Sequence, residues 1–287
     1  MEIESLYIPV ADGFNLAATL YKPVAGKTGK DYIVLINPAA AVKRSFYDKY
    51  GRFLAEQGFS ALTFDYRGIG DSRPESLKGF KAYMHDWGEK DIAGVIDWIT
   101  SKFHSIKLLV VAHSVGGQLV ALAGNNCRIN AMLLIASQSG YWKLYGSPER
   151  YRQFLFSWLA VPALTKVCGY LPVNNFRLGE DLPKDVALEW VKWSRNPQYL
   201  FGDEGLPSRN NVANFTAPIL AYSFEDDRWA TPQAVDSLME FYSCAQKTRR
   251  HVRPEEIGVS SIGHFGFFRP DIRSTLWHES TKWLGQQ

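Results

Sequence analysis

Hydrophobic and polar positions along the chain follow two different patterns. Residues 6–23 alternate apolar and polar side chains around Asp12-Gly13, a dipeptide favoured in tight turns, and so predict an antiparallel hairpin. Later apolar runs do not alternate, which is typical of parallel strands covered on both faces. These predicted strands are residues 32–36, 60–64, 107–112, 131–137 and 218–224, with a further strand near 249–253.

Segments with helical spacing separate these runs. Ile92, Val95, Ile96 and Ile99, for example, fall on one face of a helix predicted over residues 87–103. The other predicted helices are residues 46–57, 116–124, 232–241 and 271–284. Strands that alternate with helices predict right-handed crossovers and a mostly parallel sheet.

Residues 138–216 interrupt this alternation. Helical segments rich in aromatic residues cover approximately 148–168 and 183–194, and no strand is recognised within 138–216. We therefore expect a helical cap, residues 138–216, inserted into a core of residues 1–137 and 217–287. The aromatic side chains of the cap would either close an apolar pocket or pack its own helices. They are Tyr141, Trp142, Tyr145, Phe154, Phe156, Trp158, Trp190 and Trp193.

One turn between a predicted strand and a predicted helix carries a serine. The string Ala112-x-Ser114-x-Gly116 follows directly on the apolar run 107–112. A serine in such a turn has a strained backbone, so the residues two before and two after it must be small. The string is common by chance, but its place between a buried strand and a helix is the one that the chemistry requires. Ser114 is therefore the candidate nucleophile.

A serine hydroxyl needs a base to remove its proton, and the base needs a third group to fix its tautomer. His264 lies in the glycine-flanked loop Gly263-His264-Phe265-Gly266, between the last strand and the last helix, from which an imidazole can reach the sheet edge. We predict that His264 is the base. The remaining histidines lie in or beside helices or next to arginines, and His113 would point away from a site that contains the serine. They are His85, His104, His113, His251 and His278.

Two carboxylates follow the strand predicted over residues 218–224. Asp226 and Asp227 would both lie at the carboxyl end of that strand, at the edge that the serine turn also faces. One of them would orient His264, and the other would cap the turn or accept a backbone hydrogen bond. The residues alone leave both assignments open.

The negative charge that develops on a substrate carbonyl needs backbone N–H donors. We expect the first at Val115, directly after the nucleophile at a helix N-terminus. The second is expected in the loop after residue 36. Pro38 has no N–H, so Ala39 is our choice and Ala40 the second choice. The same small residues would also suit a tight strand-to-helix loop with no catalytic role.

Taken together, these residues resemble the α/β-hydrolase superfamily over nearly the whole chain. Residues 65–72 look like the family's strand-end motif Asp-x-Arg-Gly-x-Gly-x-Ser, in which Asp65 and Arg67 would brace the loop around the active site. The chain is most similar to bacterial predicted α/β hydrolases related to serine aminopeptidase-like lipases. The resemblance implies an α/β-hydrolase fold, with a mostly parallel eight-stranded sheet, an N-terminal antiparallel hairpin and an inserted helical cap.

The resemblance also favours one of the two carboxylates as the partner of His264. The family's usual span from strand start to acid, counted from Pro218, selects Asp227 and leaves Asp226 as the alternative. Two positions depart from the family pattern. Asn37-Pro38 stands where His-Gly is common, and Phe224 stands where a glycine usually precedes the acid loop.

The composition of the chain indicates which binding partners and which cellular compartment to expect. The formal charge is +3 and the basic residues are scattered among the acids, so we expect a small-molecule substrate and no nucleic acid. Residues 1–9 lack the pattern of a secretory signal, and no apolar stretch approaches the roughly 20 residues that span a bilayer, so we expect a cytoplasmic protein. The cysteines Cys127, Cys168 and Cys244 lack paired spacing and are expected to be small buried side chains.

These observations predict a serine hydrolase that cleaves an ester or related acyl bond, of the carboxylesterase or lipase kind, with no cofactor and no metal. An acyltransferase or a small-peptide peptidase would use the same residues, because the shape of the pocket selects the acceptor. A non-catalytic ligand-binding protein on the same fold is the alternative from another class. The sequence leaves the oligomeric state open, a homo-oligomer included.

Overall fold

A single eight-stranded sheet, in the order β1-β2-β4-β3-β5-β6-β9-β10, forms the centre of the molecule. The computed structural model describes residues 1–23, 31–176 and 179–287. β2 pairs antiparallel with β1 and with β4, and the remaining neighbours in this sheet are parallel. The predicted fold class, a mostly parallel sheet with an N-terminal hairpin, is confirmed. The strands are β1 (Glu2–Pro9), β2 (Asn15–Lys22), β3 (Tyr32–Asn37), β4 (Ser60–Phe64), β5 (Lys107–His113), β6 (Ile129–Ile135), β9 (Ile219–Phe224) and β10 (Lys247–Val252).

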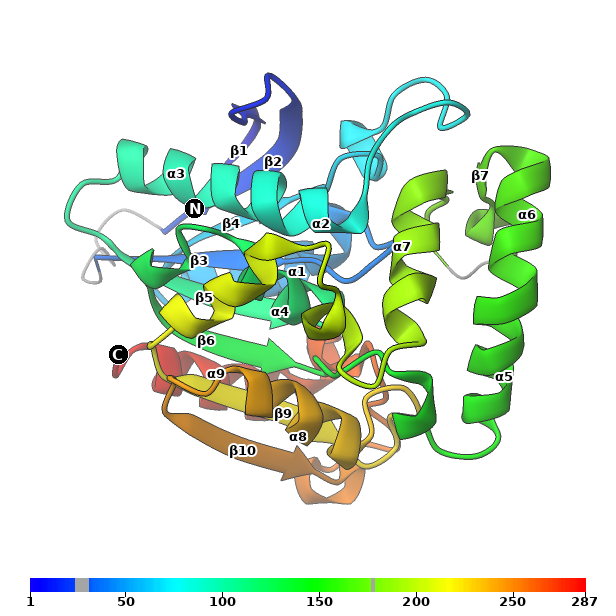
Figure 1. The fold of residues 1–287 in the computed structure, drawn as a ribbon. Helices are drawn as coiled ribbons and strands as arrows, with labels where there is room; N and C mark the ends of the chain where they lie inside the picture. Colours follow the sequence, from blue (N-terminus) through cyan, green and yellow to red (C-terminus); the bar gives the residue numbers. More distant parts are fainter. Residues whose placement is uncertain (24–30, 177–178) are drawn as a thin grey trace.

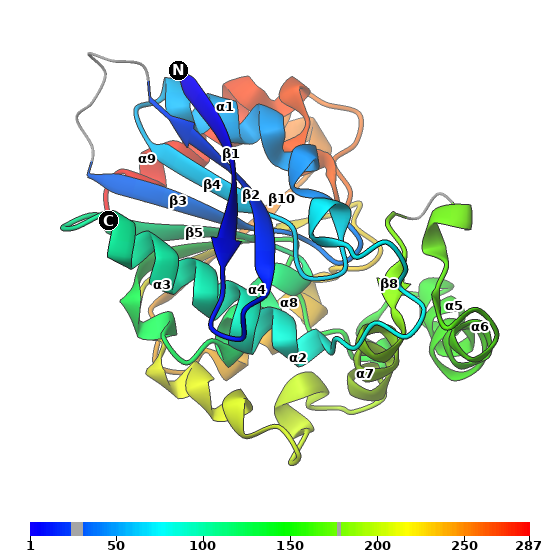
Figure 2. The ribbon, with the colours of Figure 1, turned by 90° about the horizontal axis from the view of Figure 1, so that it is seen from above.

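Helices cover both faces of this sheet. α1 and α9 lie on one face, and α3, α4 and α8 lie on the other (Figure 1, Figure 2). Strands enclosed in this way are buried on both sides, which explains why their apolar runs do not alternate. The helices are α1 (Asp48–Glu56), α2 (Met84–Asp86), α3 (Ala93–Lys102), α4 (Val115–Leu119), α5 (Glu149–Leu155), α6 (Val161–Cys168), α7 (Lys184–Ser194), α8 (Pro232–Phe241) and α9 (His278–Leu284).

Three helices lie outside these layers. α5, α6 and α7 stand beyond the end of the sheet to which the arrows of β6 and β10 point (Figure 1). A π-helical segment, Phe156–Ala160, joins α5 to α6 into one long helix. Other π-helical segments, Trp87–Ile92 and Arg273–Trp277, lead into α3 and α9. The long helix formed by α5 and α6 thus lies beyond the end of the strands (Figure 1), where the candidate site residues were expected.

Several bounds differ from the prediction: β6 spans Ile129–Ile135 and not 131–137, and α4 ends at Leu119 and is followed by a 3₁₀ turn, Val120–Leu122. Two differences are larger. β1 begins at Glu2, whereas the hairpin was predicted from residue 6. The prediction missed the start because this edge strand is mostly exposed and its apolar pattern is weak. Within residues 138–216, β7 (Tyr170–Leu171) and β8 (Leu182–Pro183) pair antiparallel, so the expectation of no strand there is wrong. Each of these strands has two residues, which is too short for a periodic pattern to be recognised.

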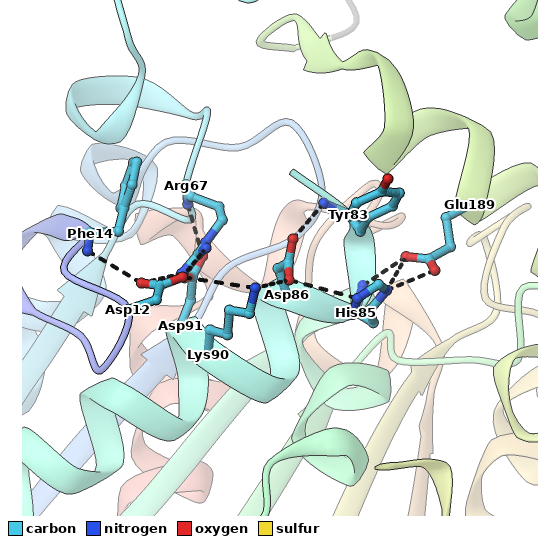
Figure 3. Close-up of polar contacts among 9 residues, drawn as sticks. All are labelled: Asp12, Phe14, Arg67, Tyr83, His85, Asp86, Lys90, Asp91 and Glu189. Atoms are coloured by element: carbon cyan, nitrogen blue, oxygen red, sulfur yellow. Dashed lines mark hydrogen bonds and ion pairs between the residues drawn. The ribbon is translucent and has the colours of Figure 1, made fainter. Parts of the chain in front are cut away.

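Arg67 of the motif at residues 65–72 joins the hairpin turn to the segment before α3 (Figure 3). Its guanidinium contacts Asp12 of the turn and the completely buried Asp91, both at 2.7 Å. Burial raises the pKa of Asp91 to about 7, although Arg67 opposes the shift. In the same motif, Asp65 pairs with Arg44 and accepts a hydrogen bond from the N–H of Arg44 at 2.6 Å. These contacts connect the loops at this edge of the sheet to one another.

A second cluster of charged side chains joins α7 to α2 (Figure 3). His85 Nδ1 lies 2.8 Å from Glu189 Oε1 of α7, and the His85 N–H donates to Glu189 Oε2 at 2.9 Å. Lys90 pairs with Asp86 at 2.7 Å, and Asp86 lies 3.7 Å from His85 Nε2. Burial lowers the pKa of His85, but the carboxylates of Glu189, Asp86 and Glu89 together outweigh that effect and leave the pKa raised. This cluster ties the helices outside the layers to the sheet domain.

The cysteines do not occupy the positions that were expected. Cys127 and Cys244 are exposed and Cys168 is half-buried, so the prediction of buried side chains is wrong; all three are free thiols. Each lies in or beside a turn or a helix end, where a small side chain fits without burial. Among the residues that the structure describes, no three metal-ligating side chains come together. No helix in these same ranges is long and apolar enough to cross a membrane.

Candidate active site

Ser114 occupies a strained turn between β5 and α4. Its φ of 51° and ψ of −118° lie outside the regions that side-chain-bearing residues favour. Gly116 allows this turn to pass close to the loop after β3, since a Cβ there would lie 2.6 Å from the carbonyl oxygen of Asn37. The need for a small residue at this position is therefore steric. Ser114 in this turn lines a cavity beyond the end of β5.

Three side chains from distant parts of the sequence meet at this turn. His264 Nε2 lies 2.9 Å from Ser114 Oγ, and His264 Nδ1 lies 2.7 Å from Asp227 Oδ2. The side chains of His264 and Asp227 are 7% and 1% exposed. Ionised Asp227 can only accept, so Nδ1 carries the proton and Nε2 has a lone pair for the Ser114 hydroxyl. Chemically, this arrangement can transfer a proton from the hydroxyl to the ring.

Asp227 is held in its ionised form by several donors. Besides the His264 ring, the N–H groups of Trp229 and Ala230 donate to Asp227 Oδ1 at 2.8 and 3.0 Å. Burial by itself would raise the pKa of Asp227, but His264 and these amides together lower the pKa below its ordinary value. A carboxylate that stays ionised can stabilise a positive charge on the neighbouring imidazole.

Asp226 has different partners from its neighbour. Its two carboxylate oxygens accept hydrogen bonds from the N–H groups of Ile262 and Gly263, at 2.8 and 2.9 Å. These residues directly precede His264 in its loop. Asp226 therefore contacts the backbone that carries the imidazole, whereas Asp227 contacts the imidazole itself.

The backbone N–H groups expected to bind the oxyanion differ in whether they already have a hydrogen-bond partner. Val115 is the first residue of α4, where an N–H has no partner within the helix. The Ala39 N–H donates to Tyr47 Oη at 2.8 Å, within the protein interior. The Ala40 N–H has no partner in the described part of the chain, and Ala40 lines the same cavity as Ser114. Of the two alanines considered, Ala40 has the free amide.

His113 lies behind the serine turn and contacts the loop of His264. The His113 ring is completely buried, with Nδ1 2.9 Å from Tyr47 Oη and Nε2 2.9 Å from the carbonyl oxygen of His264. Burial, together with the nearby His264, lowers the pKa of His113 to about 3. The ring is therefore uncharged near neutral pH.

Ser114 and His264 line a cavity of about 430 Å³. Of the aromatic residues predicted to close a pocket, Tyr145, Phe156 and Trp190 lie in its wall. The rings of Trp142, Phe154 and Trp158 contact one another instead, and buried Trp193 donates a hydrogen bond to Asp203. Some of the predicted aromatic side chains therefore line the pocket, and others pack within residues 138–216.

Several wall residues were not identified from the sequence, among them two aromatic and two charged side chains. Trp229 and Phe265 are close in sequence to Asp227 and His264, and this proximity was the signal that could have identified them. The Trp229 ring centroid lies 5.1 Å from that of His264. Glu149 and Arg152 of α5 also line the cavity and pair at 2.6 Å, and their helical spacing of three residues is the corresponding signal. The cavity wall is therefore mostly apolar, with one charged pair and the polar side chains of Gln138 and Gln153.

Solved structures with the same architecture are known from several bacteria. The esterase domain of a Rhodothermus marinus protein is 17% identical, with a TM-score of 0.62, covering 100% of this chain and 99% of that one. An esterase from Exiguobacterium antarcticum is 14% identical, with a TM-score of 0.62, covering 98% and 99% of the two chains. An a/b serine hydrolase without a lid from Xanthomonas campestris is 14% identical, with a TM-score of 0.56, covering 99% and 95%.

Sequence identities this low show that these structures and this chain share a fold.

No curated protein matches the sequence. The model of the alpha/beta hydrolase family matches residues 33–272, which include Ser114, Asp227 and His264 and most of the chain. The chain therefore belongs to the alpha/beta hydrolase family.

Proposed function

We propose that this protein is a serine hydrolase that cleaves an ester or a related acyl bond of a small, largely apolar substrate. The proposal is carried by one observation, the unbroken hydrogen bonding from Ser114 Oγ through the His264 ring to Asp227, at 2.9 and 2.7 Å. Membership of the family and the likeness to proteins described as esterases support the same conclusion.

In the first half of the reaction, Ser114 Oγ attacks the acyl carbonyl carbon while its proton moves to His264 Nε2. Asp227 stabilises the resulting imidazolium and keeps its Nδ1–H in place. The tetrahedral intermediate collapses when the bond to the leaving alcohol breaks, and the alcohol takes the proton from Nε2. Water then repeats the sequence on the acyl-enzyme, with His264 accepting its proton and returning it to Ser114, and the carboxylic acid leaves.

The oxyanion of this intermediate would be stabilised by two backbone donors. We assign the first to Val115, at the start of α4. The second is better assigned to Ala40 than to Ala39, because Tyr47 already accepts the hydrogen bond of the Ala39 amide. A donor engaged in the interior would have to break that hydrogen bond before it could serve the substrate.

The substrate would bind under an inserted cap. We infer that residues 138–216 form this cap on a core of residues 1–137 and 217–287, because α5, α6 and α7 lie outside the two helical layers (Figure 1). Phe156 and Trp190 of the cap face the same cavity as Ser114. An acyl chain or an aromatic group of the substrate would fill the apolar part of this cavity.

Covalent labelling tests the proposal directly. Purified protein is treated with a fluorophosphonate, a reagent that phosphonylates activated serines, and the adduct is located by peptide mass spectrometry. We expect labelling at Ser114 that is abolished in Ser114→Ala and strongly slowed in His264→Ala. A folded protein that takes up no label would contradict the proposal and favour a ligand-binding protein. A panel of esters, thioesters and aminoacyl substrates would then define the acyl group and the acceptor.

A further inference from the structure

Behind the proposed triad lies a buried row of hydrogen bonds that the chemistry above does not use. We propose that His113 and Tyr47 are positioning residues, which hold the His264 loop and the loop after β3 in place relative to Ser114. This inference rests on the proposed function. It adds two residues that touch neither the substrate nor the reacting atoms.

The direction of each hydrogen bond in this row follows from the inventory of donors and acceptors. The carbonyl oxygen of His264 can only accept, so His113 Nε2, at 2.9 Å, must carry a proton. In a neutral ring Nδ1 then has a lone pair, and the hydroxyl of Tyr47, at 2.9 Å, donates to it. The same hydroxyl oxygen accepts the hydrogen bond of the Ala39 N–H at 2.8 Å. Tyr47 therefore fixes the tautomer of His113, as Asp227 fixes that of His264.

Burial makes this row rigid. His113 and Tyr47 are completely buried, and Ala39 is 3% exposed. The Tyr47 ring packs edge-on against Phe268, with 4.7 Å between the centroids, and Phe268 follows His264 in the same loop. A buried hydrogen bond has no water to replace it, so loss of the Tyr47 oxygen would leave two unsatisfied polar groups.

The buried hydrogen bonds also connect the nucleophile, the base and the loop of the proposed oxyanion donor. His113 is bonded covalently to Ser114, and its ring holds the backbone of His264, so the nucleophile and the base share one support. At the other end, Tyr47 holds Ala39, the residue before the proposed oxyanion donor Ala40. Because burial keeps His113 neutral near physiological pH, it places no like charge beside His264 when that ring becomes an imidazolium.

The test uses phosphonylation of Ser114, which needs no knowledge of the natural substrate. The first-order rate constant at saturation and the half-saturating concentration of a fluorophosphonate are measured separately for wild type and for Tyr47→Phe. Tyr50→Phe is the matched control, because Tyr50 is also completely buried and its hydroxyl bonds Ser280 Oγ at 2.9 Å, away from the site. Thermal unfolding is recorded for each protein, so that a loss of stability is separated from a loss of reactivity.

We expect Tyr47→Phe to lower the saturating rate constant by about 10- to 100-fold with little change in the half-saturating concentration, because small misplacements of reacting groups are costly. Tyr50→Phe should lose less stability, because Ser280 Oγ still donates to the Trp277 carbonyl oxygen, and it should keep the wild-type rate constant. His113→Leu should behave like Tyr47→Phe. His113→Gln, whose amide N–H can reach the His264 carbonyl, should recover part of the rate.

Two results would overturn the inference. One is a folded Tyr47→Phe that reacts at the wild-type rate, and the other is an equal loss of rate in Tyr47→Phe and Tyr50→Phe. If His113→Leu does not fold, the Tyr47 and Tyr50 pair decides alone. A wild-type protein that is not labelled at Ser114 would instead remove the proposed function, and the positioning role with it.

Discussion

The edge of the sheet around Ser114 and the segment of residues 138–216, whose helices α5, α6 and α7 stand beyond that edge (Figure 1) and which is called the covering region below, are built in different ways. At the sheet edge, the side chain of Asp227 is 1% exposed and that of its partner His264 is 7% exposed, and both are fixed by hydrogen bonds. The covering region instead carries six of the eleven large apolar side chains that are exposed in the described chain. These six are Tyr151, Phe154, Leu155, Leu159, Val167 and Phe176.

This difference separates two tasks of the molecule. Residues that would carry out chemistry are held by the sheet, so their positions depend on buried contacts that tolerate little change. Several residues that would select the substrate stand on α5, none of whose residues is buried, so substitutions there disturb little of the core. Variants at the sheet edge should therefore alter rate or stability, and variants in the covering region should alter substrate preference.

The largest contrast is expected at the two adjacent carboxylates. Asp227→Asn should leave the fold intact and lower the turnover of an ester substrate by about 10⁴-fold, because the amide favours the wrong imidazole tautomer. Asp226→Asn should cause a much smaller loss, since within the described residues the Asp226 carboxylate accepts hydrogen bonds only from the N–H groups of Ile262 and Gly263. Steady-state kinetics of both variants provide the measurement. The reverse order of effects would show that Asp226 is the acid.

A second contrast concerns stability at two glycines. Gly116→Ala would place a Cβ 2.6 Å from the Asn37 oxygen and should lower the free energy of unfolding by about 1–3 kcal/mol. Gly146→Ala is the matched change in the covering region, where a Cβ would meet nothing within 4 Å, and it should be neutral or slightly stabilising. Urea denaturation measures both values. Equal losses would contradict the claim that the two regions differ in tolerance.

Substrate preference should respond to Trp190 in the covering region. Trp190→Ala removes apolar wall from the cavity that contains Ser114 and should raise the KM for large acyl or aromatic esters by about 10-fold. The kcat for a small acetyl ester should remain near the wild-type value, because the hydrogen bonds among Ser114, His264 and Asp227 are untouched. A fall in kcat for every ester, with KM unchanged, would mean that this helix supports the chemistry as well.

The smallest effect is expected at the joint between the two regions, and it should depend on pH. The pKa of His85 is raised in the folded protein, so its pairing with Glu189 contributes stability below the unfolded pKa of about 6.5 and loses it as pH rises through the folded pKa. The groups that face His85 are Glu189, Asp86 and Glu89, with Lys90 paired to Asp86.

The corresponding measurement compares wild type with Glu189→Gln. The variant should be less stable by about 1 kcal/mol at pH 5.5, and the difference should shrink at pH 8.5. Denaturation at the two pH values tests this outcome. A difference that grows with pH would have the wrong sign for a protonated His85 and would contradict the role of this pair.

Much of the fold could be predicted because the relevant patterns are local. β4 was predicted over residues 60–64 and occupies Ser60–Phe64, since an apolar run between a helix and a turn needs no distant partner to be recognised. The exposed edge strand β1 and the two-residue strands β7 and β8 were misplaced or missed. Their formation depends on pairing partners far along the chain, such as Glu2 with Lys22 and Tyr170 with Pro183.

The sequence by itself determined the order of the strands and helices of the main sheet and its two helical layers, together with the candidates Ser114 and His264, because turns at strand ends have short, recognisable signatures. Only the tertiary structure decided between neighbours in sequence: which carboxylate, Asp226 or Asp227, contacts the imidazole, and which amide, of Ala39 or Ala40, is free. Adjacent residues share almost the same local pattern, whereas their side chains and amides point in different directions. Which direction meets a partner depends on groups many residues away, such as the Tyr47 hydroxyl, that packing alone brings there.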